Sequence, residues 1–208
     1  MIISHKHKFI FIAIPKTGTH AIRFALREHM GEEDEEQVGL FVKKKLKYES
    51  LSKINHGHIS CIQAREALGE QVWNNYFKFT FVRNPWDRYI SFCSFIHREN
   101  PKFQKTPELF LRRMIDKPEI RQRILFRPQV ELICDNNNIP LVDFIGKYEN
   151  LQEDYDKICK KIGVSSQVLE QLNASNHKPF REYYNDSLFQ KVNEFYNLDI
   201  STFNYTFT

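Results

Sequence analysis

The apolar and polar residues of this chain alternate between short apolar runs and longer segments with helical spacing. Residues 9–14 form a continuous apolar run, which is typical of a buried parallel strand. Apolar side chains then recur at helical spacing from Ala21 to Leu26, and we expect this helix to end near Gly31. Residues 16–19, with one Lys, one Gly and two Thr, connect the predicted strand to the predicted helix.

The same order of strand and helix recurs further along the chain. Residues 76–82 are rich in residues favoured in strands, and Pro85 stands where it can begin the next helix. Residues 141–146 are predicted as a third strand, and residues 151–162 as an amphipathic helix closed by Gly163. This alternation predicts a three-layer α/β/α domain with a short parallel sheet and right-handed crossovers.

Further helices are predicted in the segments between and after these elements. They comprise residues 62–68, a helix from Pro107 through Met114, one opened by Pro118, one from Pro128 to Cys134, and residues 187–196. Residues 173–181 are predicted as a loop and residues 203–207 as an irregular or edge segment. A length of 208 residues fits a single domain spanning residues 1–208.

The charge of the chain changes this picture little. A net charge of +4 gives no indication of a nucleic-acid partner. The acidic block 32–36 and the basic block 43–47 are expected to be solvated faces or loops. Residues 98–127 contain nine Lys or Arg residues against four Asp or Glu, so an anionic partner fits this region.

Cysteine usage and hydropathy exclude several classes of protein. Cys61, Cys93, Cys134 and Cys159 are widely spaced and form no CxxC pair, so we expect buried thiols rather than disulfides or a zinc site. No apolar run approaches the roughly 20 residues that cross a bilayer, and the first residues lack the apolar core of a signal peptide. We therefore expect a cytoplasmic protein with no membrane partner, and the sequence carries no signal of oligomeric state.

Two loops lie where strands are predicted to lead into helices. In the loop 15–20, free backbone N–H groups and the positive end of the helix dipole favour an anion. Arg83 at the end of the second strand and Ser91 along the following helix can both reach one anion. Because both loops follow the carboxyl ends of predicted parallel strands, we expect them at one rim of the sheet.

The first loop differs from the P-loop GxxxxGK[ST], which binds nucleoside triphosphates. No Gly opens it, Pro15 and Lys16 precede Gly18, and no hydroxyl directly follows a Gly-Lys pair. No predicted strand ends in an Asp suited to Mg²⁺. ATP-dependent chemistry is therefore disfavoured, whereas a mononucleotide with anionic groups at both ends is compatible.

Each candidate residue also has a purely structural interpretation. Lys16 is otherwise an exposed loop lysine, and Arg83 is otherwise a helix-capping residue paired with Asp87, with Ser91 packed in the interior.

Two histidines that flank Gly57 have structural alternatives as well. His56 and His58 are either loop histidines with satisfied hydrogen bonds or, with Cys61, half of a metal site, the weaker interpretation since no further ligand cluster is evident. Trp73, Trp86 and most Phe residues are expected in the core.

These motifs resemble those of a known enzyme family. Residues 14–19 resemble the 5′-phosphosulfate loop of the sulfotransferases that use PAPS (3′-phosphoadenosine 5′-phosphosulfate), and residues 81–91 resemble their 3′-phosphate site. Residues 54–60 resemble the His-Gly-His segment of the carbohydrate 2-O-sulfotransferase branch, and residues 127–129 and 147–151 look like later landmarks of that branch. The resemblance, from residue 9 to about 207, implies the sulfotransferase fold, which is similar to that of P-loop nucleotide kinases.

The resemblance also implies a role for each motif residue. The 5′-phosphosulfate would be bound by Pro15, Lys16, Thr17, Gly18, Thr19 and His20. Arg83 and Ser91 would hold the 3′-phosphate, and His177 and Lys178 would lie in a loop that closes over the nucleotide.

The implied reaction needs a base and a cation. The resemblance, with the near-neutral pKa of imidazole, favours His58 as the general base, with His56 orienting the acceptor or the base. Lys16 would stabilise the phosphate oxygen that leaves sulfur, and no metal is required. The acceptor would be a hydroxyl of a saccharide or a small metabolite, with an amine as the alternative acceptor group. The alternatives are a P-loop-type phosphotransferase and a non-catalytic nucleotide-binding or interaction module.

Overall fold

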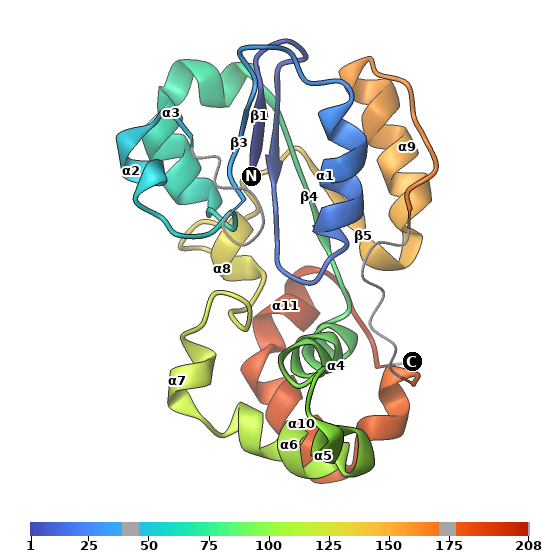
Figure 1. Ribbon diagram of the computed structural model, residues 1–208. Helices are drawn as coiled ribbons and strands as arrows, with labels where there is room; N and C mark the ends of the chain where they lie inside the picture. The colour runs from blue at the N-terminus through green and yellow to red at the C-terminus, as the bar shows by residue number, and fades with distance from the viewer. Residues whose placement is uncertain (39–45, 171–177, 208) are drawn as a thin grey trace. The chain divides into compact units, whose positions relative to one another are not determined.

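The computed structural model describes residues 1–38, 46–170 and 178–207. The chain forms two compact units: unit 1 comprises residues 1–82 and 129–172, and unit 2 comprises residues 83–128 and 173–208. Unit 1 contains β1 Ile2–Ser4, β2 Phe9–Ile12, α1 Thr19–Arg27, β3 Glu35–Glu36, α2 Glu49–Ser52, α3 Cys61–Asn75, β4 Phe77–Val82, α8 Val130–Ile133, β5 Phe144–Lys147, the 3₁₀ helix η1 Tyr148–Asn150 and α9 Leu151–Ile162 (Figure 1). Unit 2 contains α4 Pro85–Ile96, α5 Pro101–Lys105, α6 Pro107–Ile115, α7 Pro118–Arg121, the 3₁₀ helix η2 Phe180–Tyr183, α10 Asp186–Phe195 and α11 Asn197–Thr202.

The described strands form one sheet in unit 1, in the order β3-β1-β2-β4-β5. Strands β2, β4 and β5 are parallel, and they align Phe11 with Phe79 and Phe79 with Phe144. Strand β1 is antiparallel to both β2 and β3. The predicted α/β class is confirmed, and the sheet is mixed because the short turn between β1 and β2 can join only antiparallel neighbours.

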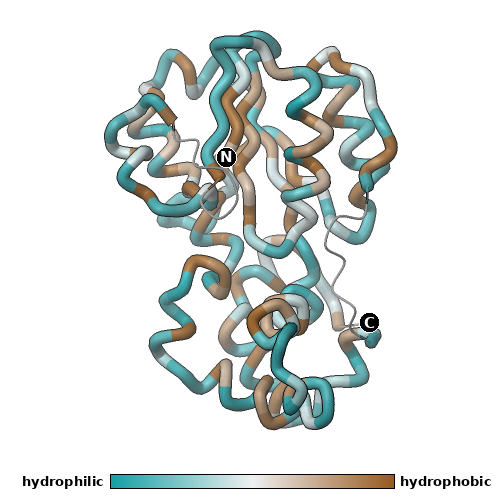
Figure 2. The backbone as a smooth tube through the Cα atoms, in the orientation of Figure 1, coloured by the Kyte–Doolittle hydropathy of each residue, from teal (hydrophilic) through white to brown (hydrophobic). Residues whose placement is uncertain are grey.

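Helices cover both faces of this sheet. On one face, α1 and α9 pack against the strands through an apolar cluster that includes Phe11, Phe79, Ile22 and Ile158. Figure 1 shows α3 on the opposite side of the strands from α1 and α9. Hydrophobic positions follow the central strands and recur along α1 in Figure 2, which is the pattern of a buried sheet and an amphipathic helix.

Strands β2 and β4 end at the same edge of the sheet because they are parallel neighbours. The loop that leads to α1 follows β2 directly at this edge. In open α/β sheets, ligands bind outside the carboxyl ends of the strands. The first predicted anion loop therefore has the expected place in unit 1.

Most of the acidic block is buried, so the expectation of a solvated block is wrong for Asp34, Glu35 and Glu36. Asp34 accepts hydrogen bonds from the Ser4 hydroxyl and from three backbone N–H groups at His5, Lys6 and Gly31. Glu35 and Glu36 form β3 beside β1. Their burial depends on a strand that is too short to produce a recognisable sequence pattern.

The basic block is described only in part. Residues 43–45 lie outside the described residues, Leu46 is buried, and the exposed Lys47 pairs with Glu33 at 3.2 Å.

Several predicted helices have the expected bounds. Helix α9 covers residues 151–162, and Gly163 ends it in the left-handed conformation with φ 72°. Helix α1 ends at Arg27, earlier than the predicted stop at Gly31. Helix α3 is longer than predicted, because Ser60 and Gln63 form a capping box at its start and the helix continues past a kink at Gly69. Helix α8 is shorter than predicted, and α11 was not predicted.

Unit 2 is a cluster of helices with its own aromatic core. Trp86, Tyr89, Phe126 and Tyr196 lie at its centre. Trp86 here and Trp73 in unit 1 are core residues, as predicted. The four cysteines are buried thiols, also as predicted. Among the described residues, none of the helices has the length and apolarity needed to cross a bilayer.

Candidate active site

The loop between β2 and α1 has a backbone suited to an anion. Lys16 and Gly18 have positive φ angles of 68° and 77°, and Thr17 between them does not. Alternation of this kind turns successive N–H groups toward one concave side, which is an anion-binding arrangement. The Thr17 hydroxyl closes the turn by donating to the Ile14 carbonyl at 2.9 Å. Since the first turn of α1 carries no acidic residue, this geometry fits a phosphate or sulfate group.

The same loop rests on the segment that leads into α9. A Cβ atom at Gly18 would lie 3.0 Å from Cδ2 of Leu151 and 3.4 Å from Cδ2 of Tyr148. Asp154 in α9 accepts from the backbone N–H of Lys147 at 2.8 Å and so anchors the start of this segment. Residues 147–151 therefore lie against Gly18 and support the anion loop.

Residues of the loop differ in exposure. Pro15, Thr17 and Thr19 are buried, whereas Lys16 is half-buried. His20 is exposed in the first turn of α1, and its imidazole pKa is lowered by partial desolvation, followed by the positive charge of Arg23.

A tight turn at His56, Gly57 and His58 lies in the same unit. Gly57 is buried, and a Cβ atom there would overlap the Gln37 carbonyl oxygen and lie 2.6 Å from an Arg23 nitrogen. The rings of His56 and His58 have centroids 6.2 Å apart. A glycine is therefore required between the two histidines, which explains the His-Gly-His pattern at this position.

The ring of His58 is held in one tautomer. Its Nδ1 atom lies 2.7 Å from the carbonyl oxygen of Ala13, so Nδ1 carries the proton and donates it to that oxygen. Burial lowers the pKa of His58 to about 3, with a smaller contribution of the same sign from Arg23. At neutral pH the imidazole is uncharged, and Nε2 carries the lone pair that a general base needs.

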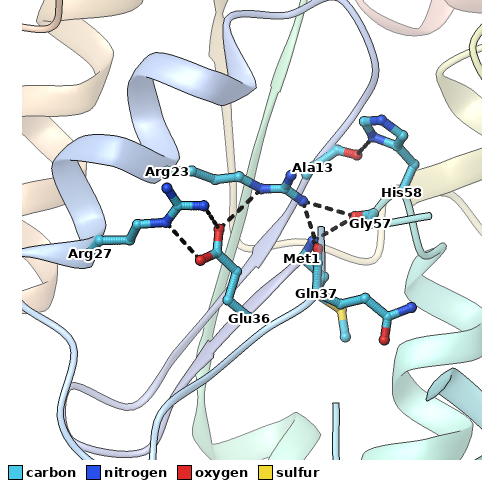
Figure 3. Close-up of polar contacts among 8 residues, drawn as sticks. All are labelled: Met1, Ala13, Arg23, Arg27, Glu36, Gln37, Gly57 and His58. Atoms are coloured by element: carbon cyan, nitrogen blue, oxygen red, sulfur yellow. Dashed lines mark hydrogen bonds and ion pairs between the residues drawn. The ribbon is translucent and has the colours of Figure 1, made fainter. Parts of the chain in front are cut away.

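A buried polar network joins α1 and β3 to this turn (Figure 3). Glu36 lies between two arginines and accepts two hydrogen bonds from Arg27, at 2.7 and 2.9 Å. Arg23 donates from Nη2 to the carbonyl oxygens of Gln37 and Gly57, both at 3.1 Å. Arg23 was not predicted as a functional residue, and its only local signal in the sequence is the four-residue spacing from Arg27 on the same helix.

The second predicted motif lies in unit 2. The Asn84 side chain caps α4 by accepting from the N–H groups of Trp86 and Asp87, and Pro85 opens the helix as predicted. Arg83 is buried and donates from Nε to Asp87 at 2.8 Å. Ser91 is 1% exposed. The ion pair is the one that the structural interpretation predicts, and a 3′-phosphate role for Arg83 and Ser91 stays a prediction.

The last predicted motif is described in part. His177 lies outside the described residues. Lys178 is exposed in unit 2, where its Nζ atom lies 3.8 Å from Glu182 and its backbone N–H donates to the Tyr183 hydroxyl. Within the part of the chain that the structure describes, no group of three or more His, Cys, Asp or Glu side chains is arranged to hold a metal ion.

Comparison with known proteins places this geometry in context. A model described as the sulfotransferase family matches residues 1–206 and so covers both units. A protein of Archaeoglobus fulgidus, described as uncharacterized, is 32% identical over 118 residues, which are 57% of this chain and 93% of the relative. No solved structure matches the chain.

Proposed function

Since the chain belongs to the sulfotransferase family, an enzyme family that uses PAPS, we propose that it transfers the sulfuryl group of PAPS to a hydroxyl of a saccharide or small-metabolite acceptor. The observation that carries the proposal is the hydrogen bond between His58 and Ala13, which ties a neutral imidazole to the strand end that leads into the anion loop. We further propose that residues 1–208 act as one sulfotransferase domain, since the family match spans both units.

The residues of the first loop fit the 5′-phosphosulfate of PAPS. Lys16 brings a positive charge, and the backbone from Thr17 to Thr19 brings N–H groups at the start of α1. Arg83 and Ser91 are proposed for the 3′-phosphate because their types and their eight-residue spacing match the family motif. His177 and Lys178 are proposed, on the motif alone, to close over the nucleotide.

PAPS supplies the sulfuryl group when bound. A bond forms between the acceptor oxygen and sulfur, and the bond between sulfur and the 5′-phosphate oxygen breaks. His58 takes the acceptor proton on Nε2, since Nδ1 already donates to Ala13. Lys16 stabilises the negative charge left on the 5′-phosphate oxygen, and His56 orients the acceptor or the base. The products are a sulfate ester and 3′,5′-bisphosphorylated adenosine (PAP).

The low pKa of His58 is consistent with this role once the charge of the donor is considered. An imidazole with a pKa of about 3 is neutral but a weak base. Negative charges close to an imidazole stabilise its protonated form and raise its pKa. The anionic groups of PAPS would therefore strengthen His58 as a base in the complex.

The acceptor is proposed from weaker signals. The His-Gly-His turn resembles the carbohydrate 2-O-sulfotransferase branch, which favours a saccharide. The excess of Lys and Arg in residues 98–127 suits an anionic acceptor. A small hydroxylated metabolite stays the alternative, because the fold by itself does not select a substrate.

The proposal is tested by binding and turnover on the full chain. Isothermal titration should show that PAP binds more tightly than adenosine 5′-monophosphate and that ATP with Mg²⁺ binds weakly. Transfer of labelled sulfate from PAPS to a panel of saccharides, phenols and small alcohols then identifies the acceptor class. Absence of PAP binding would refute the proposal. Binding without transfer to any acceptor would favour a non-catalytic nucleotide-binding module, and phosphate transfer from ATP would favour a phosphotransferase.

A further inference from the structure

We propose that Arg23 is a positioning residue that holds the general base His58 at a set distance from the anion loop. This inference rests on the proposed function of His58. Arg23 projects from α1 toward the turn that precedes His58, and Figure 3 shows it between Glu36 and the Gly57 carbonyl. No motif of the sequence analysis includes this residue.

The contact of Arg23 with the turn is fully buried. Arg23 is 3% exposed, and its Nη2 atom lies 3.1 Å from the carbonyl oxygen of Gly57, the residue before His58. The same nitrogen lies 3.1 Å from the carbonyl oxygen of Gln37. The Met1 amino group also donates to both carbonyl oxygens, so Arg23 is one of two buried donors that favour this placement of the turn.

Neighbouring groups restrain the rest of the turn. The Gln37 side-chain amide donates to the carbonyl oxygens of Leu51, Ile54 and His56, at 3.1, 2.8 and 3.1 Å. The amino group of Met1 donates to the Gly57 carbonyl oxygen at 2.5 Å. Because each carbonyl from His56 to Gly57 has a buried donor, the direction of the His58 side chain is set by these donors.

Helix α1 links this turn to the anion loop. The helix begins at Thr19, directly after the loop, and Arg23 follows one turn later. On the other side of the loop, Ala13 accepts the Nδ1 proton of His58. The imidazole is thus tied to the chain both before and after Lys16. Loss of the Arg23 contact would remove the link from α1 and leave the turn to Met1, Gln37 and the Ala13 contact, and we expect the ring to shift.

Charge gives the same residue a second effect on His58. Burial lowers the pKa of Arg23 to about 10, so it stays positive at neutral pH, with Glu36 as its counter-charge at 3.8 Å. The groups that lower the pKa of His58 by their charge are Arg23 on α1, the Met1 amino group before β1 and His56 in the turn. Removal of the Arg23 charge should therefore raise the pKa of His58.

Arg27 provides a matched control on the same helix. It donates two hydrogen bonds to the same Glu36 and none to the turn. Arg23→Met and Arg27→Met each remove one positive charge and one partner of Glu36. Only Arg23→Met removes the guanidinium donor from the Gly57 carbonyl, so a difference between the two variants reports the contact of Arg23 with the turn.

The experiment compares both variants with the wild type on the full chain. For Arg23→Met we expect kcat to fall about 10-fold to 100-fold, as for a misplaced catalytic group, while the Kd of PAP changes less than about 2-fold. The acidic limb of the pH–rate profile should move to higher pH. Arg27→Met should keep kcat within about 2-fold and leave the limb in place. Arg23→Lys, which keeps a charged donor, should recover part of the lost kcat.

A second readout tests the position of His58 without turnover. Long-range ¹H–¹⁵N spectra should show shifted His58 ring signals in Arg23→Met and unchanged signals in Arg27→Met. Equal kcat losses in the two variants, or unchanged ring signals in Arg23→Met, would overturn the proposal. If Arg23→Met does not fold, the same comparison is made with Arg23→Lys. Full turnover by His58→Ala would instead refute the base role, and the ring signals would still decide whether Arg23 places the imidazole.

Discussion

The Nδ1 atom of His58 lies 2.7 Å from the carbonyl oxygen of Ala13, at the end of the strand that leads into the anion loop. This hydrogen bond decides which ring nitrogen can act as a base, because a carbonyl oxygen accepts a proton and cannot donate one. The Nε2 atom is left as the acceptor. The resemblance already favours His58 over His56, and this hydrogen bond gives the proposed base a defined tautomer.

Replacement of His58 by Ala should abolish most turnover and leave nucleotide binding intact. Loss of a general base typically costs about 100-fold to 10,000-fold in rate, whereas the anion loop does not depend on the imidazole. The measurement is kcat with PAPS together with the Kd of PAP. The control is His56→Ala, for which we expect a smaller loss. A larger loss of kcat in His56→Ala would indicate that His56 is the base.

Protein stability should fall as the pH drops from about 6.5 toward 3. The pKa of His58 is about 3 in the folded chain and near 6.5 when unfolded, so the unfolded state binds more protons between these values. The stabilising effect of the neutral ring is complete above this window and lost within it. Denaturant unfolding at several pH values measures the slope. His58→Gln should show a flatter dependence, and parallel curves for the two proteins would contradict the shifted pKa.

Replacement of Lys16 by Met should lower kcat by about 100-fold or more, because a cation beside the leaving oxygen acts mainly in the transition state. Met is a fair replacement here, since Lys and Met have a similar cost at the positive φ of 68°. Lys53→Met is the control, since that exposed lysine pairs with Glu49 on the surface of unit 1. Equal kcat values for the two variants would show that Lys16 takes no part in the reaction.

Replacement of Arg83 by Met should selectively weaken binding of the 3′-phosphate. We expect the affinity for PAP to fall about 10-fold or more, the usual effect of a lost charge-assisted hydrogen bond. Affinity for adenosine 5′-monophosphate, which lacks that phosphate, should stay constant in a calorimetric titration. Asp87→Asn serves as the control, because it disrupts the ion pair and keeps the guanidinium. Equal weakening of both ligands would support the purely structural role of Arg83.

Replacement of Gly57 by Ala should destabilise the fold by about 1–3 kcal/mol or more, since the added methyl group meets backbone and a buried guanidinium. Gly31→Ala is the matched control, because its new Cβ would meet only the flexible side chain of Lys6, at 3.2 Å. Thermal unfolding of both variants gives the comparison. Similar melting temperatures would show that the turn can relax around a side chain.

Signals within a few residues of sequence were sufficient to predict the strands and helices that flank the motifs. The apolar run before Lys16, the proline at residue 85 and Gly163 each act within one turn of the chain, so their effect can be read from neighbouring residues. These signals placed the first anion loop at the carboxyl end of a parallel strand. Resemblance then supplied the proposed chemistry.

Contacts between distant residues could not be predicted in this way. The hydrogen bond from Arg23 to Gly57 joins positions 34 residues apart, and nothing local in the sequence indicates that these two residues meet. The burial of Asp34 depends on donors in and after β1, a strand of three residues. Polar groups at such positions resemble surface residues in sequence, because burial is a property of what surrounds them.

The closeness of Leu151 to Gly18, where an added Cβ would lie 3.0 Å from Cδ2 of Leu151, has a consequence for synthesis of the chain on the ribosome. The proposed anion loop at residues 15–20 packs close to side chains that are translated more than 100 residues later. Domains usually fold as units, and translation adds about 5–20 residues per second. The nascent chain therefore spends several seconds with an unsupported loop, and we expect it to acquire nucleotide affinity only after the start of α9 has emerged.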